Sequence, residues 1–384
     1  MTLIRSIFVL LIGLAQLPSS FATDIPIPAP PSGTQKAFIL MDADSGRVLA
    51  EQNPDEKMEP ASITKIMTAY LVFHELKANH IHMEDTVPIS ERAWRTQGSR
   101  MFVQVGTRVS VSDLVHGMIV QSGNDATVAL AEHLAGSEEA FAGWMNKHAE
   151  RMGLKNTHFL NPTGMPAEGH LTTVRDMAIL TQNLIRDFPE QYKLFAVREF
   201  FYNNITQQNR NPLFAIDPTA DGVKTGHTDA AQYCLVGTSK RDDMRLIAVV
   251  FGSKSVKTRS AETLALLNFG FRFYETHHLY KVGETQTPAK VWKGETDEVP
   301  LGVLQTFSVT IPRGKEASLE VTTNINEQIE APVVKGQPYG KQEVKFEGKK
   351  ISETALVALK DVPEGGLWKQ LTDEVRMYAE SFFN

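Results

Sequence analysis

The sequence contains very little cysteine, because Cys234 is the only one among 384 residues. A single cysteine excludes an internal disulfide, so the fold must rest on its apolar cores. The net charge of −6 also lacks the basic excess that is typical of nucleic-acid-binding proteins, and we expect no nucleic-acid partner. Internal repeats and low-complexity tracts are missing as well. A hydrophobic content of 42% over this length instead indicates two folded domains.

Apolar runs long enough to span a bilayer are also missing, and the apolar stretch near the N-terminus has another explanation. Arg5 supplies a positive end, residues 7–17 form an apolar centre, and Ser20-Phe21-Ala22 is a small-x-small cleavage site. These are the three parts of a secretory signal peptide over residues 1–22. We therefore expect an exported protein, and no lipoprotein anchor, since no cysteine follows the cleavage site closely.

Hydrophobic patterning predicts a mixed domain over residues 23–284. Two strands around an Asp-Ser-Gly turn are expected within 37–53, and helical patterns dominate from 62 to about 190. Three further strands follow Asp221, and the last helix of this region is expected over 259–277. This order favours an α/β (α+β) fold in which one antiparallel sheet is flanked by helices.

A β-rich domain and a terminal helix are expected after this point. Residues 285–364 consist of short apolar runs separated by turn residues, which predicts a small all-β sandwich. Residues 365–384 predict an amphipathic helix that follows a Gly-Gly pair and lies on a membrane surface. Its bulky residues recur at steps of three and four: Trp368, Leu371, Val375, Tyr378 and Phe382. Two alternatives remain, in which this stripe packs on the β-rich domain or pairs with a second copy.

Ser62 and Lys65 are separated by three positions in a stretch that is otherwise almost entirely apolar. A helix that is apolar on nearly all sides is usually buried, and a buried lysine needs a partner or loses its proton. Pro60 suits a helix start, and a serine in the first turn has a backbone N–H available for an oxyanion hole. Taken alone, this pair is also explained by a capping serine and a snorkelling lysine.

Two further short motifs strengthen the catalytic interpretation of this pair. Ser122-Gly123-Asn124 lies in a break between two helical patterns, and Lys224-Thr225-Gly226 lies in a predicted strand. Each tripeptide could occur by chance. The ordered set S-x-x-K, S-x-N and K-T-G, in helix, loop and strand contexts, is a strong signal for a serine nucleophile with a lysine base.

With these motifs the sequence resembles the penicillin-binding proteins and serine β-lactamases, and among them the low-molecular-mass D-alanyl-D-alanine carboxypeptidases. The resemblance covers nearly all of the chain after residue 22. It implies that the three motifs meet in one cleft between sheet and helices, where Ser62 attacks the carbonyl between two D-alanines and Lys65 accepts its proton. It also implies that Ser122, beside Lys224, relays a proton to the leaving amine, and that Asn124 holds Lys65 and the substrate amide.

The resemblance further implies the substrate contacts. Lys224 and Thr225 are expected to face the terminal carboxylate of the peptide, and Gly226 belongs to the same strand of the cleft. The backbone N–H groups of Ser62 and His227 are expected to form the oxyanion hole.

Two arginines match positions at which the family carries positive charge for the terminal carboxylate. Arg210 precedes the K-T-G strand, and Arg259 lies near the start of the predicted last helix. For each of them a surface charge without a role in binding remains an alternative.

The partners implied by the resemblance are peptidoglycan stem peptides ending in D-Ala-D-Ala, with β-lactams as covalent inhibitors. We expect a peripheral protein on the periplasmic side of the bacterial inner membrane, and neither a cofactor nor a metal. A β-lactamase, a DD-endopeptidase or a receptor that stays acylated are alternatives on the same scaffold. Three other candidates are disfavoured: His80 and His82 as metal ligands, Cys234 as a reactive thiol, and Glu168 as a deacylating base.

Overall fold

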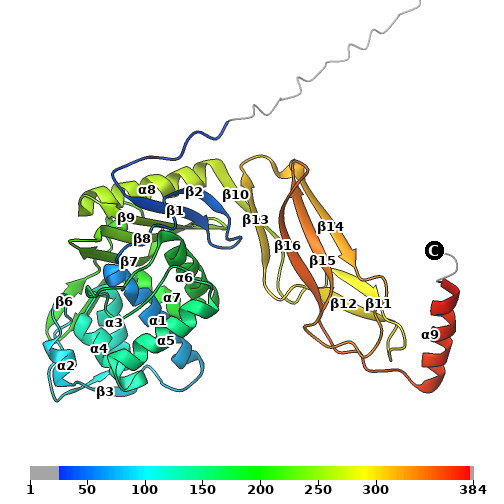
Figure 1. The fold of residues 1–384 in the computed structure, drawn as a ribbon, viewed down its shortest axis with the longest axis horizontal. Helices are drawn as coiled ribbons and strands as arrows, with labels where there is room; N and C mark the ends of the chain where they lie inside the picture. The colour runs from blue at the N-terminus through cyan, green and yellow to red at the C-terminus, as the bar shows by residue number, and fades with distance from the viewer. Residues whose placement is uncertain (1–25, 381–384) are drawn as a thin grey trace, which may run out of the picture.

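The computed structural model describes residues 26–380. The predicted signal peptide of residues 1–22 and Phe382 lie outside the described residues. Within them, a mixed domain, a β-rich domain and a terminal helix follow one another along the long axis of the molecule (Figure 1).

A five-stranded antiparallel sheet forms the middle layer of the mixed domain, in the order β2-β1-β9-β8-β7. Its strands are β1 (Ala37–Asp42), β2 (Val48–Gln52), β7 (Ala220–Thr228), β8 (Gln232–Arg241) and β9 (Met244–Ser253). The two early strands and the three late strands of the sequence therefore join one sheet, as predicted. Strand β7, which carries the K-T-G motif, lies at one edge of this sheet.

Both faces of the sheet are covered, because successive side chains of a strand point to opposite faces. In β1, Ile39 and Met41 are buried against the helical region, whereas Phe38 and Leu40 are buried on the side of α8 (Val256–Phe273). The result is a three-layer arrangement of helices, sheet and helix.

The helical region lies between β2 and β7 in the sequence. It contains η1 (Ala61–Thr64), α1 (Lys65–Lys77), α2 (Glu91–Arg95), α3 (Val111–Val120), α4 (Asn124–Ala135), α5 (Glu138–Arg151), α6 (Val174–Asp187), α7 (Pro189–Tyr192), η2 (Lys193–Ala196) and η3 (Pro212–Ala215). Two antiparallel strand pairs interrupt it: β3 (Thr86–Pro88) with β4 (Arg108–Ser110), and β5 (Glu199–Tyr202) with β6 (Ile205–Gln208). Helix α4 ends at Gly136, whose φ of 79° lies in the left-handed region that glycine adopts without strain.

Helix α8 begins and ends earlier in the chain than the predicted range of 259–277. The pattern favoured a helix to residue 277, but α8 ends at Phe273 and the chain continues as strand β10 (Tyr274–Tyr280). Strand β10 pairs with β13 (Phe307–Pro312), and the Arg313 guanidinium donates to the carbonyls of Phe271 and Tyr274. A distant strand and a distant side chain therefore end the helix, which local propensity cannot reveal.

The β-rich domain is a sandwich of two sheets, as predicted. One sheet is the pair β10–β13, and the other has five strands in the order β11-β12-β16-β15-β14. Its strands are β11 (Thr287–Lys290), β12 (Glu298–Gly302), β14 (Leu319–Ile325), β15 (Pro338–Phe346) and β16 (Lys349–Ala358), with a short turn η4 (Glu316–Ser318) before β14. Apolar residues such as Val309, Val344 and Leu356 form a separate core here.

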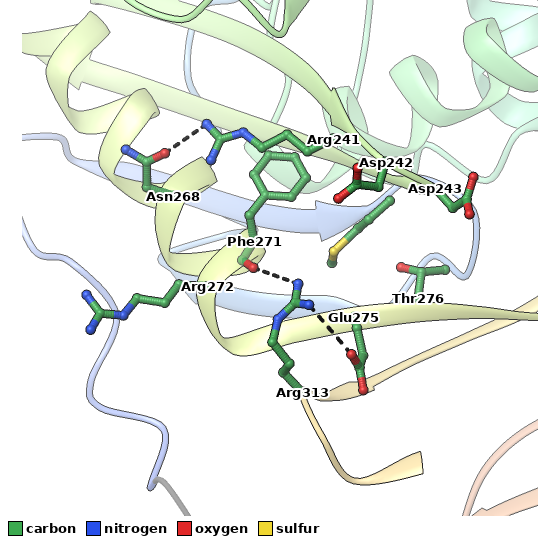
Figure 2. A pocket seen from close by; sticks show the side chains of 10 residues that line it. Arg241, Asp242, Asp243, Asn268, Phe271, Arg272, Glu275, Thr276 and Arg313 are labelled. Carbon is green, nitrogen blue, oxygen red and sulfur yellow. Dashed lines mark hydrogen bonds and ion pairs between the residues drawn. The ribbon is translucent and has the colours of Figure 1, made fainter.

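Polar contacts join the two domains. Thr276 of β10 donates to the Asp42 carboxylate at 2.6 Å, and the hydroxyls of Ser45 and Thr310 are also 2.6 Å apart. Beside these contacts lies a cavity of about 380 Å³. Figure 2 shows Arg313 on one side of this cavity, and Arg241 on the other side with its bond to Asn268. None of the residues of the three motifs lines it.

The terminal helix α9 (Leu367–Glu380) lies at the end of the β-rich domain remote from the mixed domain (Figure 1). Its polar face contacts the domain: Asp373 is buried, accepts the Lys293 N–H at 2.8 Å, and contacts the Lys369 ammonium. Its apolar stripe is exposed instead, with Trp368 83% and Val375 70% accessible. Among the described residues, the structure has no helix that is long and apolar enough to cross a membrane.

Candidate active site

Ser62 lies in the short turn η1 directly before α1. The preceding Ala61 has a φ of 48°, which L-residues rarely adopt outside constrained sites. The segment around Gly164 packs against this turn so closely that a Cβ at Gly164 would lie 1.7 Å from the Ala61 carbonyl oxygen. The turn that carries Ser62 is therefore held from outside as well as by its own helix.

Lys65 is almost completely buried, and its amine has three neighbours. The Nζ atom lies 3.0 Å from Ser62 Oγ, 2.7 Å from Asn124 Oδ1 and 2.6 Å from the Thr163 carbonyl oxygen. Burial lowers the pKa of Lys65 to about 7, and the charge of Arg210 acts in the same direction. A neutral amine has two N–H groups and one lone pair. If the two oxygens accept the N–H groups, the lone pair remains for the Ser62 hydroxyl.

Ser122 and Lys224 form a second contact, near enough to Lys65 for the charges of the two lysines to interact. Ser122 is buried, has a φ of 63°, and accepts a hydrogen bond from Lys224 Nζ at 2.9 Å. Burial lowers the pKa of Lys224 well below its ordinary value, and the nearby charges of Lys65, Arg210 and Arg259 lower it further. Two buried lysines close to each other disfavour a proton on both.

The loop that carries Ser122 and Asn124 is fixed by the next residue, Asp125. This buried carboxylate accepts the backbone N–H groups of Met101 and Phe102, each at 2.9 Å. Asn124 itself donates its Nδ2–H to the Gln97 carbonyl at 2.7 Å. Because the amide nitrogen is engaged there, Oδ1 is the atom that faces Lys65.

Strand β7 brings the K-T-G motif against the Ser62 turn. A Cβ at Gly226 would lie 3.1 Å from the Pro60 carbonyl oxygen and from Ala61 Cβ, so a side chain here would push the strand away. Thr225 is buried, whereas His227 is exposed and its ring lies 4.3 Å from that of Tyr233.

The two arginines predicted to bind carboxylate occupy different settings. Arg259 is buried, and its Nη1 donates to the carbonyls of Gly226 at 3.0 Å and Cys234 at 3.2 Å. Its Nε is buried without a hydrogen-bond partner among the described residues. Arg210 is exposed, and its Nε donates to Gln121 Oε1 at 3.2 Å, next to Ser122.

Sequence reasoning missed one component of this site, the Thr163 carbonyl. A backbone acceptor has no side-chain signature, so no residue pattern could identify it directly. The signal available was the sequence Asn161-Pro162-Thr163-Gly164, which is typical of a turn held by an asparagine side chain. Glu168, the residue of this segment that the sequence analysis weighed, is exposed.

The remaining candidates lie apart from these contacts. Cys234 is fully buried, and burial raises the pKa of its thiol to about 12, which disfavours the reactive thiolate. His80 contacts the Glu75 carboxylate at 2.7 Å. No group of three or more potential metal-binding side chains occurs in residues 26–380.

Comparisons with known proteins agree with the resemblance seen in the sequence. Residues 26–255 match the family described as D-alanyl-D-alanine carboxypeptidase, and residues 274–364 match the C-terminal domain of penicillin-binding protein 5. The chain is 44% identical to the D-alanyl-D-alanine carboxypeptidase DacC of Escherichia coli (strain K12), over 95% of this chain and 93% of that one.

Solved structures give the same result. Penicillin-binding protein 5 from Haemophilus influenzae is 41% identical, with a TM-score of 0.80 over 88% of this chain and 100% of that chain. Penicillin-binding protein D2 from Listeria monocytogenes, solved in an ampicillin-bound form, is 28% identical, with a TM-score of 0.58 over 62% of this chain and 98% of that chain.

Proposed function

The chain belongs to the D-alanyl-D-alanine carboxypeptidase family and is a serine-type peptidase, and we propose that it removes the terminal D-alanine of peptidoglycan stem peptides through an acyl-enzyme on Ser62. The observation that carries the assignment of the nucleophile is the 3.0 Å contact between Ser62 Oγ and Lys65 Nζ. A serine is activated when a base lies within hydrogen-bonding reach and a third group orients that base. Asn124 and the Thr163 carbonyl supply the orienting contacts.

Acylation begins with Lys65 in its neutral form. Its lone pair takes the Ser62 proton while Ser62 Oγ attacks the carbonyl carbon between the two D-alanines. The oxyanion is stabilised by the backbone N–H groups of Ser62 and His227, and losing one such donor typically costs about 10²–10³ in rate. The closeness of β7 to the Ser62 turn, seen at Gly226, supports this pairing of donors.

Expulsion of D-alanine needs a proton on its amine. Ser122 Oγ gives its proton to this amine and takes in exchange the proton that Lys65 removed from Ser62, so that Lys65 is neutral again. The charge of Lys224, 2.9 Å from Ser122, supports this relay. Burial and the nearby positive charges lower the pKa of Lys224, and the carboxylate of a bound peptide counteracts the effect of those charges. A bound peptide therefore favours the protonated form of Lys224. Water then hydrolyses the ester, with Lys65 again as the base.

The terminal carboxylate requires fixed positive charge at the far side of the cleft. Arg259 is supported for this role by its contact with the Gly226 carbonyl and by the unpaired Nε, with Lys224 and Thr225 on the same strand. Arg210 adds positive charge near Ser122, because its Nε donates to Gln121, and this charge contributes to the lowered pKa of both Lys65 and Lys224.

Penicillin provides the direct test, since it presents a strained amide and a carboxylate in place of the dipeptide end. Intact-mass measurement should show a single adduct, and peptide mapping should assign it to Ser62. An adduct that persists in Ser62→Ala would contradict the assignment. Release of D-alanine from a D-Ala-D-Ala pentapeptide then tests the reaction. Rapid turnover of penicillin would instead indicate a β-lactamase. Cleavage of cross-links alone would indicate an endopeptidase, and the absence of any turnover would indicate a receptor.

We further propose that the protein is exported and that α9 holds it on the periplasmic surface of the inner membrane. The proposal is supported by the N-terminal residues 1–22 and by an exposed apolar stripe whose Trp368 and Tyr378 suit the water–lipid boundary. Deleting residues 366–384 should release the protein from membranes without changing activity on soluble peptides. A truncated protein that still sediments with membranes would contradict the proposal.

A further inference from the structure

The segment from Leu160 to His170 lies directly against the base of the proposed reaction. Besides the Thr163 carbonyl on Lys65, its Pro162 carbonyl accepts the Thr68 hydroxyl of α1 at 2.7 Å. Two consecutive carbonyls therefore face one helix. Two side chains of the segment that no step of the reaction uses, Asn161 and His170, hold it in this position.

Asn161 fixes the turn from inside. Its Oδ1 accepts the backbone N–H groups of Thr163 at 3.2 Å, Gly164 at 2.8 Å and Met165 at 3.2 Å. Its Nδ2 donates to the Met165 carbonyl at 2.9 Å. With the N–H groups of the turn gathered on one oxygen, the Thr163 carbonyl is left pointing to Lys65.

His170 joins the segment to the turn that carries Ser62. It is buried, its Nδ1 accepts the Leu160 N–H at 3.2 Å, and its Nε2 lies 3.0 Å from Thr64 Oγ1. Because the Thr64 hydroxyl already donates to the Ala61 carbonyl, the His170 Nε2 must carry the hydrogen. Burial lowers the pKa of His170 to about 4, and the charge of His158 acts in the same direction, so the ring is neutral at working pH.

We propose that Asn161 and His170 are positioning residues for Lys65, which keep the Thr163 carbonyl on Nζ and thereby keep the amine lone pair directed at Ser62. This inference rests on the proposed role of Lys65 as base. Without the carbonyl, the amine can rotate and present an N–H to Ser62 Oγ instead of its lone pair. In that arrangement it cannot accept the proton.

A loosened segment also changes the surroundings of Lys65. The charged groups that face it are Asp125 on α4, Lys224 on β7 and Arg210 before β7, and these stay in place. What changes is access of water to Nζ. Since burial is the largest cause of the lowered pKa of Lys65, hydration raises that pKa, and water replaces the lost carbonyl as acceptor. The base is then protonated at neutral pH.

The test is the pH profile of penicillin acylation in Asn161→Ala. At neutral pH the first-order acylation rate should fall by roughly 10- to 100-fold, part of what a general base supplies, with non-covalent affinity nearly unchanged. The acid limb of the profile should move to higher pH, so that alkaline buffer restores part of the rate. An unmoved limb, or a wild-type rate, would overturn the proposal.

Matched variants separate positioning from stability. Asn146 forms two hydrogen bonds of 2.8 Å with the backbone of Phe159, the residue directly before this segment. Asn146→Ala therefore loosens the neighbouring chain without removing a contact of Asn161 or His170, and it should lower only Tm. His170→Gln keeps a donor for Thr64 and should retain most of the rate, whereas His170→Phe should repeat the shifted limb. If Asn146→Ala shifts the limb equally, the positioning role is wrong. If Lys65→Arg still acylates, the base assignment fails instead.

Discussion

The lysines of the candidate active site and those beside the terminal helix have opposite surroundings. Lys65 and Lys224 are buried among hydroxyl, amide and carbonyl groups, and burial lowers the pKa of both. Lys293 and Lys369 are paired with carboxylates, Lys293 with Glu374 and Glu330 and Lys369 with Asp297 and Asp373, and these contacts raise the pKa of both. The same side chain is therefore a proton acceptor in one region and a fixed cation in the other.

The difference shows how burial and the neighbouring groups together set the charge of a lysine. Neutral acceptors stabilise an amine in either protonation state, so burial decides and the proton is lost easily. Carboxylates stabilise only the ammonium form, so the lysine stays charged and joins the helix to the domain by ion pairs. Burial therefore favours a neutral amine in the candidate active site, whereas the ion pairs at the helix junction keep their lysines charged.

The largest effect is expected when the cleft loses the ability to hold a neutral base. Lys65→Arg keeps a cation that does not lose its proton at working pH. Acylation by penicillin should fall by roughly 10²–10⁴-fold, the usual contribution of a general base. Mass spectrometry of the adduct against time measures it, and circular dichroism shows whether the fold is kept. Activity within about tenfold of wild type would mean that another group takes the proton.

A smaller effect is expected at Arg259, whose guanidinium donates hydrogen bonds to two backbone carbonyls and lies over the Tyr233 ring. If its guanidinium also pairs with the peptide carboxylate, Arg259→Ala should lower kcat/KM on D-Ala-D-Ala ends. The loss should correspond to about 1.5–3 kcal/mol of transition-state stabilisation. A peptide with an amidated end is the control, because it should be a poor substrate that is nearly indifferent to the change. Equal losses on both substrates, with a lowered Tm, would give Arg259 a purely structural role at β7.

The cleft was more predictable from the sequence than its supports were. The three motifs can be recognised by residue type and order. The structure joins Lys65 to Ser62 and Asn124 by hydrogen bonds, and Lys224 to Ser122. The Thr163 carbonyl could not be predicted, because every residue has one. The end of α8 at Phe273 and the inward polar face of α9 depend on partners far away in the sequence, such as Arg313 and Lys293.

The pH dependence of wild-type acylation sharpens the comparison further. The pKa of Lys65 is lowered to about 7, so its basic form dominates above this pH and is lost below it. The acylation rate should therefore rise about tenfold per pH unit on the acid side and level off near neutrality. An unperturbed lysine would be deprotonated in only about one molecule in 2,500 at pH 7, and its limb would extend to about pH 10. An acylation rate that still rises toward pH 10 would mean that burial does not lower the pKa of Lys65.

The smallest effect on catalysis is expected at the junction of α9. Burial alone would raise the pKa of Asp373, but the hydrogen bonds from the Lys369 ammonium and the Lys293 N–H hold it below its usual range. Its stabilising contribution is therefore complete at neutral pH and is lost only as the pH falls through that lowered value.

Asp373→Asn keeps an acceptor for the Lys293 N–H and loses the ion pair, whereas Asp373→Ala loses both. Amide exchange over residues 367–380 should accelerate modestly in the first variant and by roughly tenfold or more in the second, as expected for local opening. Activity on soluble peptides should stay at the wild-type level, because the cleft contains none of these groups. If exchange is unchanged in Asp373→Ala, the carboxylates do not hold the helix, and the contrast with the cleft lysines does not apply there.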